Sequence, residues 1–504
     1  MCGIIAAYGD FSDDQVRTMM SMIKHRGPDG SGLLRMNDSI LGHVRLSIID
    51  LEGGSQPMTN ESGNIAVALN GEIYNQYELR RRLEERHTFK NRSDTEVLLH
   101  LYEEDHVEMF NEIDGMFAMV LAGENGLLLA RDPLGIKPLY YGRKGNTFLA
   151  ASEMKAFPAM DELYMLPAGH AMYANGKPWQ YKHPFQPLPS LIYPSLNEVL
   201  SEIRRRLDYA VKKRLMSDVP VGVYLSGGVD SSIIAAMMRP YTVNLHSFTA
   251  GMPGAPDLEA AREVARYLDT THHELVYTAD DVRQSIPEVI KYLESYDAPL
   301  VRSAVPMYFV SRLASEHVKV VLSGEGADEL FAGYEYLNGF NDRIRLRKEL
   351  SDITIRLQDT NLQRADRMSM AHGLEARVPF LDLDLVRYIH RLPVELLEQR
   401  PGRPEKWLLR EACRGLIPPG ILKRKKMKFS EGAGSSEVIM ESVENNISFE
   451  EFRKEKEVIP GLALRSPEEL YYYRIWRKVM GPDLSPFLVG RTLDKSAGTV
   501  KKSL

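Results

Sequence analysis

The 504-residue chain is longer than one globular domain, at roughly 100–200 residues per domain. Hydrophobic residues make up 44% and charged residues 26%, which argues against wholesale disorder and fibrous repeats. The net charge of −6 argues against nucleic acid or anionic membrane as a partner. The apolar stretch 116–122 is far short of the roughly 20 residues of a membrane-spanning helix. Two cysteines cannot build a disulfide framework, so we expect a reducing, cytoplasmic location.

Short β-rich runs with glycine and asparagine punctuation dominate the first part of the chain. The pattern predicts strands over residues 4–8, 42–49, 65–69, 117–122, 126–130 and 148–151. It predicts helices over residues 13–24, 76–86 and 94–104. We therefore expect an antiparallel β-sandwich flanked by a few helices.

A proline-rich stretch, residues 183–195, separates this part from a differently patterned second half and suits an extended linker. Strands and helices then alternate. Strands are predicted over 222–225, 246–249 and 318–322, and helices over 196–216, 231–238 and 257–268. This alternation indicates a parallel sheet with helices on both faces. From about residue 340 onward the sequence reads as mostly helical, and the polar tail 494–504 as frayed.

Cys2 stands directly after the initiator methionine. Removal of Met1 would leave Cys2 with an α-amine of pKa ~8, a suitable base for the adjacent thiol. Position alone is weak support, because most residues at position 2 are inert.

Further segments follow Cys2 in a characteristic order: HRGPDG (25–30), RLSIID (45–50), NGEIYN (70–75), SDTE (93–96), RDPLG (131–135) and SEMK (152–155). Each has a plain reading as a turn or a surface strand. In this order behind Cys2 they resemble the glutaminase domain of the class II, amino-terminal-nucleophile amidotransferases. The resemblance covers essentially the whole first part of the chain.

That resemblance implies that Cys2 attacks the side-chain amide of glutamine, releasing glutamate and ammonia. The tetrahedral oxyanion needs donors aimed at it, and the implied donors are the Asn70 side chain and the Gly71 backbone N–H. The implied glutamine-binding residues are Arg45 for the α-carboxylate, Glu72 and Asp94 for the α-ammonium, and Ile48 and Ile49 through their backbones.

A glycine-rich turn, SGGVDSS (226–232), lies between a predicted strand and a predicted helix. Such a turn directs backbone N–H groups and the helix dipole towards an anion. No lysine follows the glycines, which excludes a Walker A loop. Asp230 would repel phosphate unless Mg²⁺ lay between them. The string resembles the signature of the ATP pyrophosphatases, which adenylate an acceptor; a plain strand-to-helix turn is the alternative.

A second loop, SGEGADELF (323–331), follows the predicted strand 318–322. Its acids, Glu325, Asp328 and Glu329, would lie at the carboxyl end of a parallel strand, where ligands bind. The alternative is a polar turn that enters an acidic helix start.

Both halves together resemble the family of glutamine-hydrolysing asparagine synthetases, as do LHSF (245–248), PDL (256–258), GLEARVPFLD (373–382) and KMKFS (426–430). The resemblance implies a glutaminase domain over 1–185 and an ATP-dependent synthetase domain over 196–504. It implies Mg²⁺ at Asp230 and Asp328, Lys426 near the phosphates, and Glu325 as a base for the attacking ammonia. The full implied ATP site comprises Leu225, Ser226, Gly227, Gly228, Asp230, Ser231, Ser232, Ala250, Ser323, Gly324 and Lys426.

The implied substrates are glutamine, aspartate and ATP, with the aspartate β-carboxylate activated as β-aspartyl-AMP and then displaced by ammonia. A homodimer is expected by analogy only. The motifs fix ATP and glutamine better than they fix the acceptor, so an amidotransferase that acts on another carboxylate stays open. Glu375, Arg377 and Asp382 are candidates near the acceptor, and Arg377 could equally pair with an acid to hold the fold.

Two further interpretations compete, the first for the basic run 423–428 and the second, a binding or regulatory role, for the whole chain. The basic run 423–428 could mark a nuclear-localisation or nucleic-acid patch, although the residues after it match the synthetase pattern. A catalytically silent protein that keeps the fold is the second interpretation. Intact Cys2, Asn70, Asp94, Asp230 and Asp328 argue against it.

Overall fold

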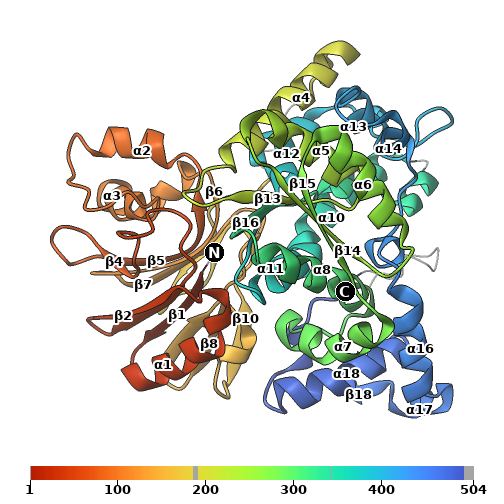
Figure 1. The fold of residues 1–504 in the computed structure, drawn as a ribbon. Helices are drawn as coiled ribbons and strands as arrows, with labels where there is room; N and C mark the ends of the chain where they lie inside the picture. Colours follow the sequence, from red (N-terminus) through yellow and green to blue (C-terminus); the bar gives the residue numbers. More distant parts are fainter. Residues whose placement is uncertain (1, 186–190, 341, 493–504) are drawn as a thin grey trace.

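The computed structural model describes residues 2–185, 191–340 and 342–492. Part of the predicted proline-rich linker (186–190) and the tail 494–504, predicted to fray, lie outside the described residues. The chain forms two lobes that pack against each other, the first antiparallel and the second built on a parallel sheet (Figure 1).

The first lobe contains two six-stranded antiparallel sheets. One has the order β10-β8-β9-β1-β3-β2, with bounds Glu162–Met165, Tyr140–Lys144, Thr147–Ala151, Gly3–Tyr8, Ser39–Arg45 and Gly30–Met36. The other has the order β12-β11-β7-β6-β5-β4, with bounds Trp179–Gln180, His170–Tyr173, Gly126–Arg131, Gly115–Gly123, Ala66–Ile73 and Met58–Thr59.

These two sheets pack face to face through small and aliphatic side chains. Ile4 and Ala6 of β1 share one buried cluster with Ala118 and Val120 of β6. Because side chains alternate along a strand, the next residues point outward and are covered by helices. Helix α1 (Asp13–Met22) covers the first sheet, and α2 (Gln76–Leu83) and α3 (Glu96–Asp105) cover the second. The predicted antiparallel sandwich flanked by helices is confirmed.

The second lobe is built on a five-stranded parallel sheet with the order β15-β14-β13-β16-β17. The strand bounds in that order are Thr271–Val276, His246–Gly251, Val221–Tyr224, Val320–Leu322 and Glu375–Arg377. Val223 packs into the cluster of α4 (Leu196–Lys213), α5 (Val229–Met238) and α6 (Pro256–Leu268) on one face. Tyr224 packs into the cluster of α7 (Ala279–Leu293) and α8 (Ala298–Ser315) on the other. Helices thus cover both faces, as predicted.

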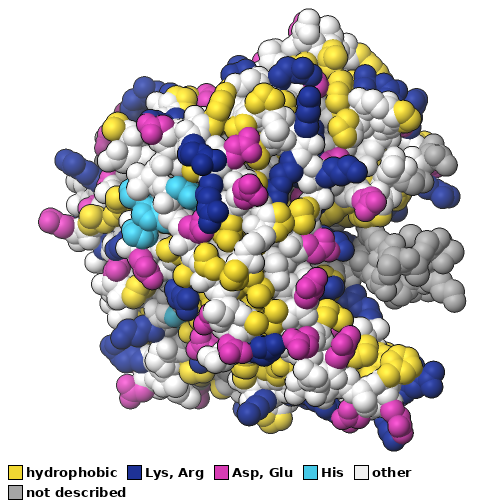
Figure 2. All heavy atoms as spheres, turned by 45° about the vertical axis from the view of Figure 1, so that its right-hand side comes forward, with side chains coloured by type: hydrophobic (Ala, Val, Ile, Leu, Met, Phe, Trp, Pro, Cys, Tyr) yellow, Lys and Arg dark blue, Asp and Glu magenta, His cyan; other side chains and the backbone are white. Residues whose placement is uncertain are grey.

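The rest of the second lobe is mostly helical, as expected. Its elements are α9 (Ala327–Leu330), α10 (Arg343–Arg356), α11 (Asn361–Met370), α12 (Leu383–Arg391), α13 (Trp407–Ala412), α14 (Pro419–Lys423), α15 (Phe429–Gly432), α16 (Ser436–Asn446), α17 (Phe449–Glu455) and α18 (Pro467–Met480), with a small hairpin of β18 (Glu457–Ile459) and β19 (Leu462–Ala463). No helix among the described residues has the length and apolar character needed to cross a membrane. Acidic and basic side chains intermingle on the face shown in Figure 2.

Two differences from the predicted elements matter for the sites. The strand predicted over 42–49 ends at Arg45. The chain turns after it, and the Arg45 side chain donates hydrogen bonds to the carbonyls of Ile49 and Asp50 in that turn. The edge strand β17 was not predicted, since three residues with charged ends carry no strand periodicity. Both segments contribute to the region between the lobes.

Candidate active sites

Cys2 lies immediately before β1, in the buried region between the lobes. Its backbone N–H donates to Asn70 Oδ1 at 3.2 Å, and its carbonyl accepts from Arg26 Nε at 3.1 Å. Burial raises the pKa of the Cys2 thiol. The residue is therefore held from both sides, and the thiol needs a nearby base before it can act as a nucleophile.

Asn70 and Gly71 lie next to it on β5. Asn70 uses its Oδ1 to bind Cys2, and its buried Nδ2 has no hydrogen-bond partner among the described residues. A Cβ on Gly71 would lie 2.0 Å from the Met116 carbonyl oxygen, so only glycine fits against β6. A buried donor without a partner costs free energy of folding. This donor, Asn70 Nδ2, lies beside the candidate nucleophile Cys2.

Two buried carboxyl groups, Glu72 and Asp94, adjoin this point. Asp94 Oδ2 accepts from the Ile73 N–H at 2.7 Å, and burial raises its pKa to about 6. Burial, reinforced by the charges of Glu375 and Asp94, raises the pKa of Glu72 well above its usual value. Burial disfavours the ionised forms of these two acids, and a cationic partner would stabilise those forms.

Arg45 ends β3, and Ile48 and Ile49 belong to the loop that follows it. The Arg45 guanidinium donates to the carbonyls of Leu51 at 3.1 Å and of Asp50 at 2.6 Å. The Ile49 carbonyl is its third acceptor, at 3.2 Å, and the Ile48 carbonyl accepts from Asp218 N–H in the second lobe at 3.0 Å. The predicted glutamine-binding residues thus come from β3 and the loop after it, from β5 and from the turn before α3.

The second lobe reaches into this first site. Arg377 of β17 lies with its guanidinium 3.4 Å from Glu72 and 2.5 Å from Glu375. Asp382 pairs with Arg214 at 2.8 Å. Of the two readings of Arg377 from sequence, pairing with neighbouring acids is the one that its contacts match.

The two loops predicted to form the ATP site lie at the carboxyl edge of the parallel sheet. Residues 225–228 connect β13 to α5, and residues 323–326 connect β16 to α9. β13 and β16 are neighbours at the point where the strand order changes direction, which is where open parallel sheets bind ligands. The second loop contacts the first turn of α5, because a Cβ on Gly324 would lie 2.9 Å from Asp230 Cβ.

The first loop is fixed by its own hydroxyl groups. Ser226 N–H donates to Ser231 Oγ at 3.2 Å, and Gly228 N–H donates to Ser226 Oγ at 3.3 Å. Gly227 has φ +68°, and a Cβ there would lie 2.4 Å from that of Ala260 on α6. The other predicted members, Leu225, Ser232, Ala250 and Ser323, are buried around the two loops.

Lys406 joins the two predicted magnesium ligands and was missed from sequence. Its ammonium lies 2.5 Å from Asp230 and 2.7 Å from Asp328. Lys426 also pairs with Asp328. Burial alone would lower the pKa of Lys406, but the two aspartates outweigh it and hold that pKa above its usual value. No motif surrounds Lys406, so only its contacts reveal it.

The donor set fits Mg²⁺. Asp230 Oδ1 is buried with no partner in the described residues, and it is a different oxygen from the Oδ2 that pairs with Lys406. Carboxylate oxygens are the ligands that Mg²⁺ prefers. Burial raises the pKa of Asp230, so an additional cation would stabilise its ionised form.

Two further acids of the second loop pair with their neighbours. Glu325 forms an ion pair with Arg364 of α11. Glu329 accepts from the Tyr334 hydroxyl, and burial raises its pKa to about 7. Both acids are therefore paired with residues outside the loop.

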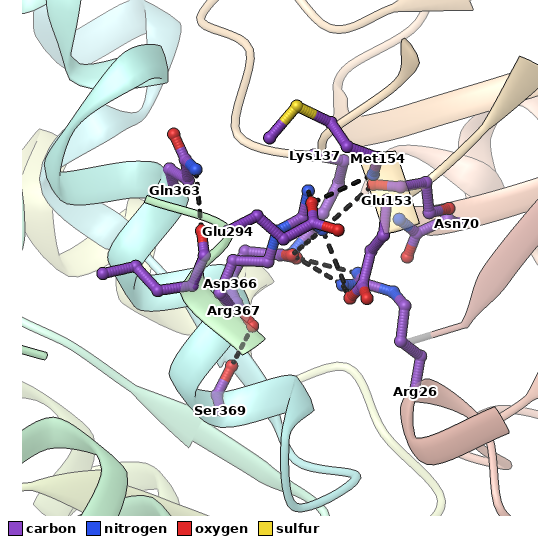
Figure 3. Close-up of polar contacts among 12 residues, drawn as sticks. Arg26, Asn70, Lys137, Glu153, Met154, Glu294, Gln363, Asp366, Arg367 and Ser369 are labelled. Atoms are coloured by element: carbon purple, nitrogen blue, oxygen red, sulfur yellow. Dashed lines mark hydrogen bonds and ion pairs between the residues drawn. The ribbon is translucent and has the colours of Figure 1, made fainter. Parts of the chain in front are cut away.

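A buried ionic cluster joins the two lobes (Figure 3), and it includes Arg26, which donates to the Cys2 carbonyl. Arg26 donates to Glu153 Oε1 at 2.8 Å within the first lobe, and to both Asp366 oxygens of α11, at 2.8 and 3.1 Å. Burial alone would raise the pKa of Asp366. The Arg26 guanidinium and neighbouring cations outweigh that effect and hold the pKa of Asp366 below its usual value.

Arg367, the next residue of α11, continues the cluster. It donates to the Ser152 carbonyl and to Glu294 Oε2, both at 2.9 Å. Glu294 in turn accepts from the backbone N–H groups of Met154 at 3.0 Å and Lys155 at 2.7 Å. The two lobes are therefore tied by specific buried bonds, with Cys2 on one end of them.

Known proteins share this arrangement of domains. Residues 1–183 match the glutamine amidotransferase domain, and residues 202–352 and 340–466 match asparagine synthase. A probable glutamine-hydrolysing asparagine synthetase of Dictyostelium discoideum is 38% identical. The match covers 95% of this chain and 94% of that protein. Glutamine-hydrolysing asparagine synthetase 1 of Arabidopsis thaliana is 38% identical over 94% of this chain and 86% of its own. That of Sandersonia aurantiaca is 40% identical over 86% and 88%. With this similarity running through both lobes, the chain belongs to the family of glutamine-hydrolysing asparagine synthetases.

Proposed function

We propose that this chain makes asparagine from aspartate, ATP and glutamine, with residues 1–185 as the glutaminase domain and residues 196–504 as the synthetase domain. Glutamine and water give glutamate and ammonia in the first domain. Aspartate and ATP give β-aspartyl-AMP and pyrophosphate in the second, and ammonia then displaces AMP to leave asparagine. A cytoplasmic location and a homodimer stay predictions.

In the glutaminase domain, Cys2 is the nucleophile once Met1 has been removed and its amine is free to take the thiol proton. The observation that carries this role is the buried Asn70 Nδ2 beside Cys2, which has no hydrogen-bond partner within residues 2–185, 191–340 and 342–492. With the Gly71 N–H it would stabilise the oxyanion, a role that supplies several kcal/mol in other acyl-transfer enzymes. Glu72 and Asp94 would bind the α-ammonium of glutamine.

Arg45 would bind the α-carboxylate of glutamine as a two-pronged donor. Its present carbonyl acceptors, at Ile49, Asp50 and Leu51, keep the guanidinium in one orientation at the pocket. Ile48 and Ile49 contribute backbone groups from the same loop. A preoriented arginine loses little side-chain entropy when the carboxylate binds.

In the synthetase domain, the loops 226–228 and 323–324 would surround ATP, with Leu225 and Ala250 at the adenosine. Mg²⁺ held by Asp230 and Asp328 supplies positive charge to the pyrophosphate leaving group when it is bound. Lys406 and Lys426 would neutralise the remaining phosphate charge, since both contact Asp328. Glu325 would take the proton that ammonia loses when it attacks the acyl carbon.

The joined lobes suit this chemistry. Ammonia in bulk water at neutral pH is mostly ammonium, which cannot attack, and an acyl-adenylate exposed to water hydrolyses. The buried bonds from Arg26 and Arg367 to both lobes would keep the two half-reactions enclosed together.

The acceptor is tested by pyrophosphate release with ATP, Mg²⁺ and ammonium across a panel of carboxylic acids. We expect release with aspartate, with asparagine as the product. Release with other acids but none with aspartate would favour the amidotransferase that acts on a different carboxylate.

A further inference from the structure

Four side chains of the kind that ligate metals meet on the outer side of the first lobe. Glu61, His87, His100 and Glu103 each offer one ligand atom, and these atoms all lie within 4.8 Å of one another. We call them the His–Glu cluster. Glu61 lies in the turn after β4, His87 follows α2, and the other two lie one turn apart on α3. These elements lie on the side of the lobe away from the synthetase half (Figure 1).

Three of the separations inside the cluster lie near those of a tetrahedral site, and the others are no longer than 4.8 Å. Glu103 Oε2 lies 2.9 Å from His100 Nδ1 and 3.5 Å from His87 Nδ1. His100 Nδ1 lies 3.6 Å from Glu61 Oε2. Tetrahedral zinc with bonds of about 2.0–2.1 Å places its ligand atoms roughly 3.3 Å from one another. The four groups therefore need little movement to surround an ion.

Neighbouring groups hold the outward-facing atoms of the cluster. Glu61 Oε1 accepts from the Thr88 N–H at 2.7 Å, which leaves Oε2 facing inward. Glu103 Oε1 accepts from Asn60 Nδ2, also at 2.7 Å. Outer contacts of this kind are typical of metal ligands, because they fix ring and carboxylate orientation.

The His87 imidazole has an outer contact as well, whereas His100 Nε2 has no hydrogen-bond partner among the described residues. His87 Nε2 lies 3.3 Å from the Glu104 carboxylate, an arrangement of carboxylate and histidine that sets which ring nitrogen faces inward. The rings of His87 and His100 stack with centroids 4.5 Å apart, and both Nδ1 atoms lie within 3.5 Å of Glu103 Oε2. His100 is buried, whereas Glu61 is exposed and leaves a path for an ion to enter.

We propose that the His–Glu cluster is a Zn²⁺ site. Two imidazole nitrogens and two carboxylate oxygens form a set that suits zinc, and the two carboxylates balance its charge. Mg²⁺ prefers an all-oxygen set and would not compete well. The ion would link the segment between α2 and α3 to α3 and to the turn after β4. That segment leads to Asp94. This site is independent of the proposed catalytic function.

Zinc binding is measured on metal-free protein in a Cys2→Ala background, which removes the reactive thiol as a ligand. The protein is titrated with Zn²⁺ against a chromophoric chelator, and its thermal midpoint is followed with and without the ion. We expect one tight site per chain and a midpoint that rises with Zn²⁺ but not with excess Mg²⁺. His87→Gln and Glu61→Gln each remove one ligand from a partly exposed position, so both variants should fold.

Loss of an outer contact typically costs 10–100-fold in metal affinity. We therefore expect Glu104→Gln to weaken binding by about that factor, and His87→Gln or Glu61→Gln by at least about a hundredfold. Glu78→Gln on α2 is the matched acidic control. His317→Gln is the histidine control, because His246, His273 and His317 form a separate stack of imidazoles in the second lobe.

Unchanged zinc affinity in both ligand variants would overturn the proposal, as would a loss that occurs only in His317→Gln. Binding that vanishes in His87→Gln and Glu61→Gln but persists in both controls would support it. Thermal midpoints measured in chelator alone separate lost zinc binding from lost folding in every variant.

Discussion

The side-chain nitrogen of Asn70, which has no hydrogen-bond partner in the described part of the chain, is the most specific feature of the first site. Asn70 has a donor and an acceptor on one amide, and Cys2 uses only the acceptor. A buried donor without a partner costs about 1–3 kcal/mol, a cost that makes sense where charge develops during a reaction.

Replacement of Asn70 by Asp keeps an acceptor for Cys2 and removes the donor. We expect glutamate release from glutamine to fall about 100–1,000-fold in kcat, because one oxyanion donor is lost. Ammonia-dependent asparagine synthesis should stay near the wild-type rate. Asn146→Asp, in an exposed turn of the same lobe, is the control. A normal glutaminase rate in Asn70→Asp would remove Asn70 from the site.

The raised pKa of Asp94 predicts a pH dependence. Burial brings this pKa to about 6, and the carboxylate form is the one that would bind the α-ammonium of glutamine. Glutamine kcat/KM should therefore be maintained above pH 6 and fall about tenfold per unit as the pH drops below it. Glutamate release is measured from pH 5 to 8 on wild type and on Asp94→Asn, which should be poor at every pH. A flat wild-type profile down to pH 5 would contradict this role.

At the scale of elements, neighbouring strands bring together chemistry from distant parts of the sequence. The loops after β13 and β16 were predicted because each carries its chemistry in a short local string. Lys406, which lies between Asp230 and Asp328, comes from a stretch with no motif and was not predicted. Its place depends on how the helices after residue 340 pack, which no local pattern encodes.

Removal of the Lys406 charge should disable the second site selectively. Lys406→Met leaves two partly buried carboxylates without their shared cation, and loss of one partner costs several kcal/mol in fully buried pairs. We expect ammonia-dependent pyrophosphate release to fall at least about tenfold, to recover in part at high Mg²⁺, and glutaminase activity to persist. Lys428→Met, whose side chain is exposed, is the control. Wild-type rates and Mg²⁺ dependence in Lys406→Met would contradict the account.

At the scale of the whole molecule, the two lobes share buried charges. The fold class of each lobe could be predicted, because strand and helix periodicity is local. The contacts of Arg26 with Asp366 and of Arg377 with Glu72 join residues more than 300 positions apart, and they could not be predicted. Sequence motifs identified the chemical groups of each site, whereas the packing between lobes determines how the sites are connected.

Asp366→Asn tests whether the shared charges connect the half-reactions. The change leaves Arg26 short of one buried carboxylate, and we expect a loss of about 3–5 kcal/mol in the free energy of unfolding. If the chain stays folded, asparagine formed per glutamate released should fall, because ammonia escapes to water and becomes ammonium. Asp352→Asn on α10 is the control. An unchanged ratio with unchanged stability would show that this cluster does not couple the lobes.

We propose that one chain contains a cysteine-dependent glutaminase and a separate synthetase. The decisive measurement is the asparagine formed by Cys2→Ala, with glutamine or with ammonium as the nitrogen source. We expect loss of synthesis from glutamine and retention of synthesis from ammonium, both with ATP and Mg²⁺. Wild-type synthesis from glutamine in Cys2→Ala would contradict it.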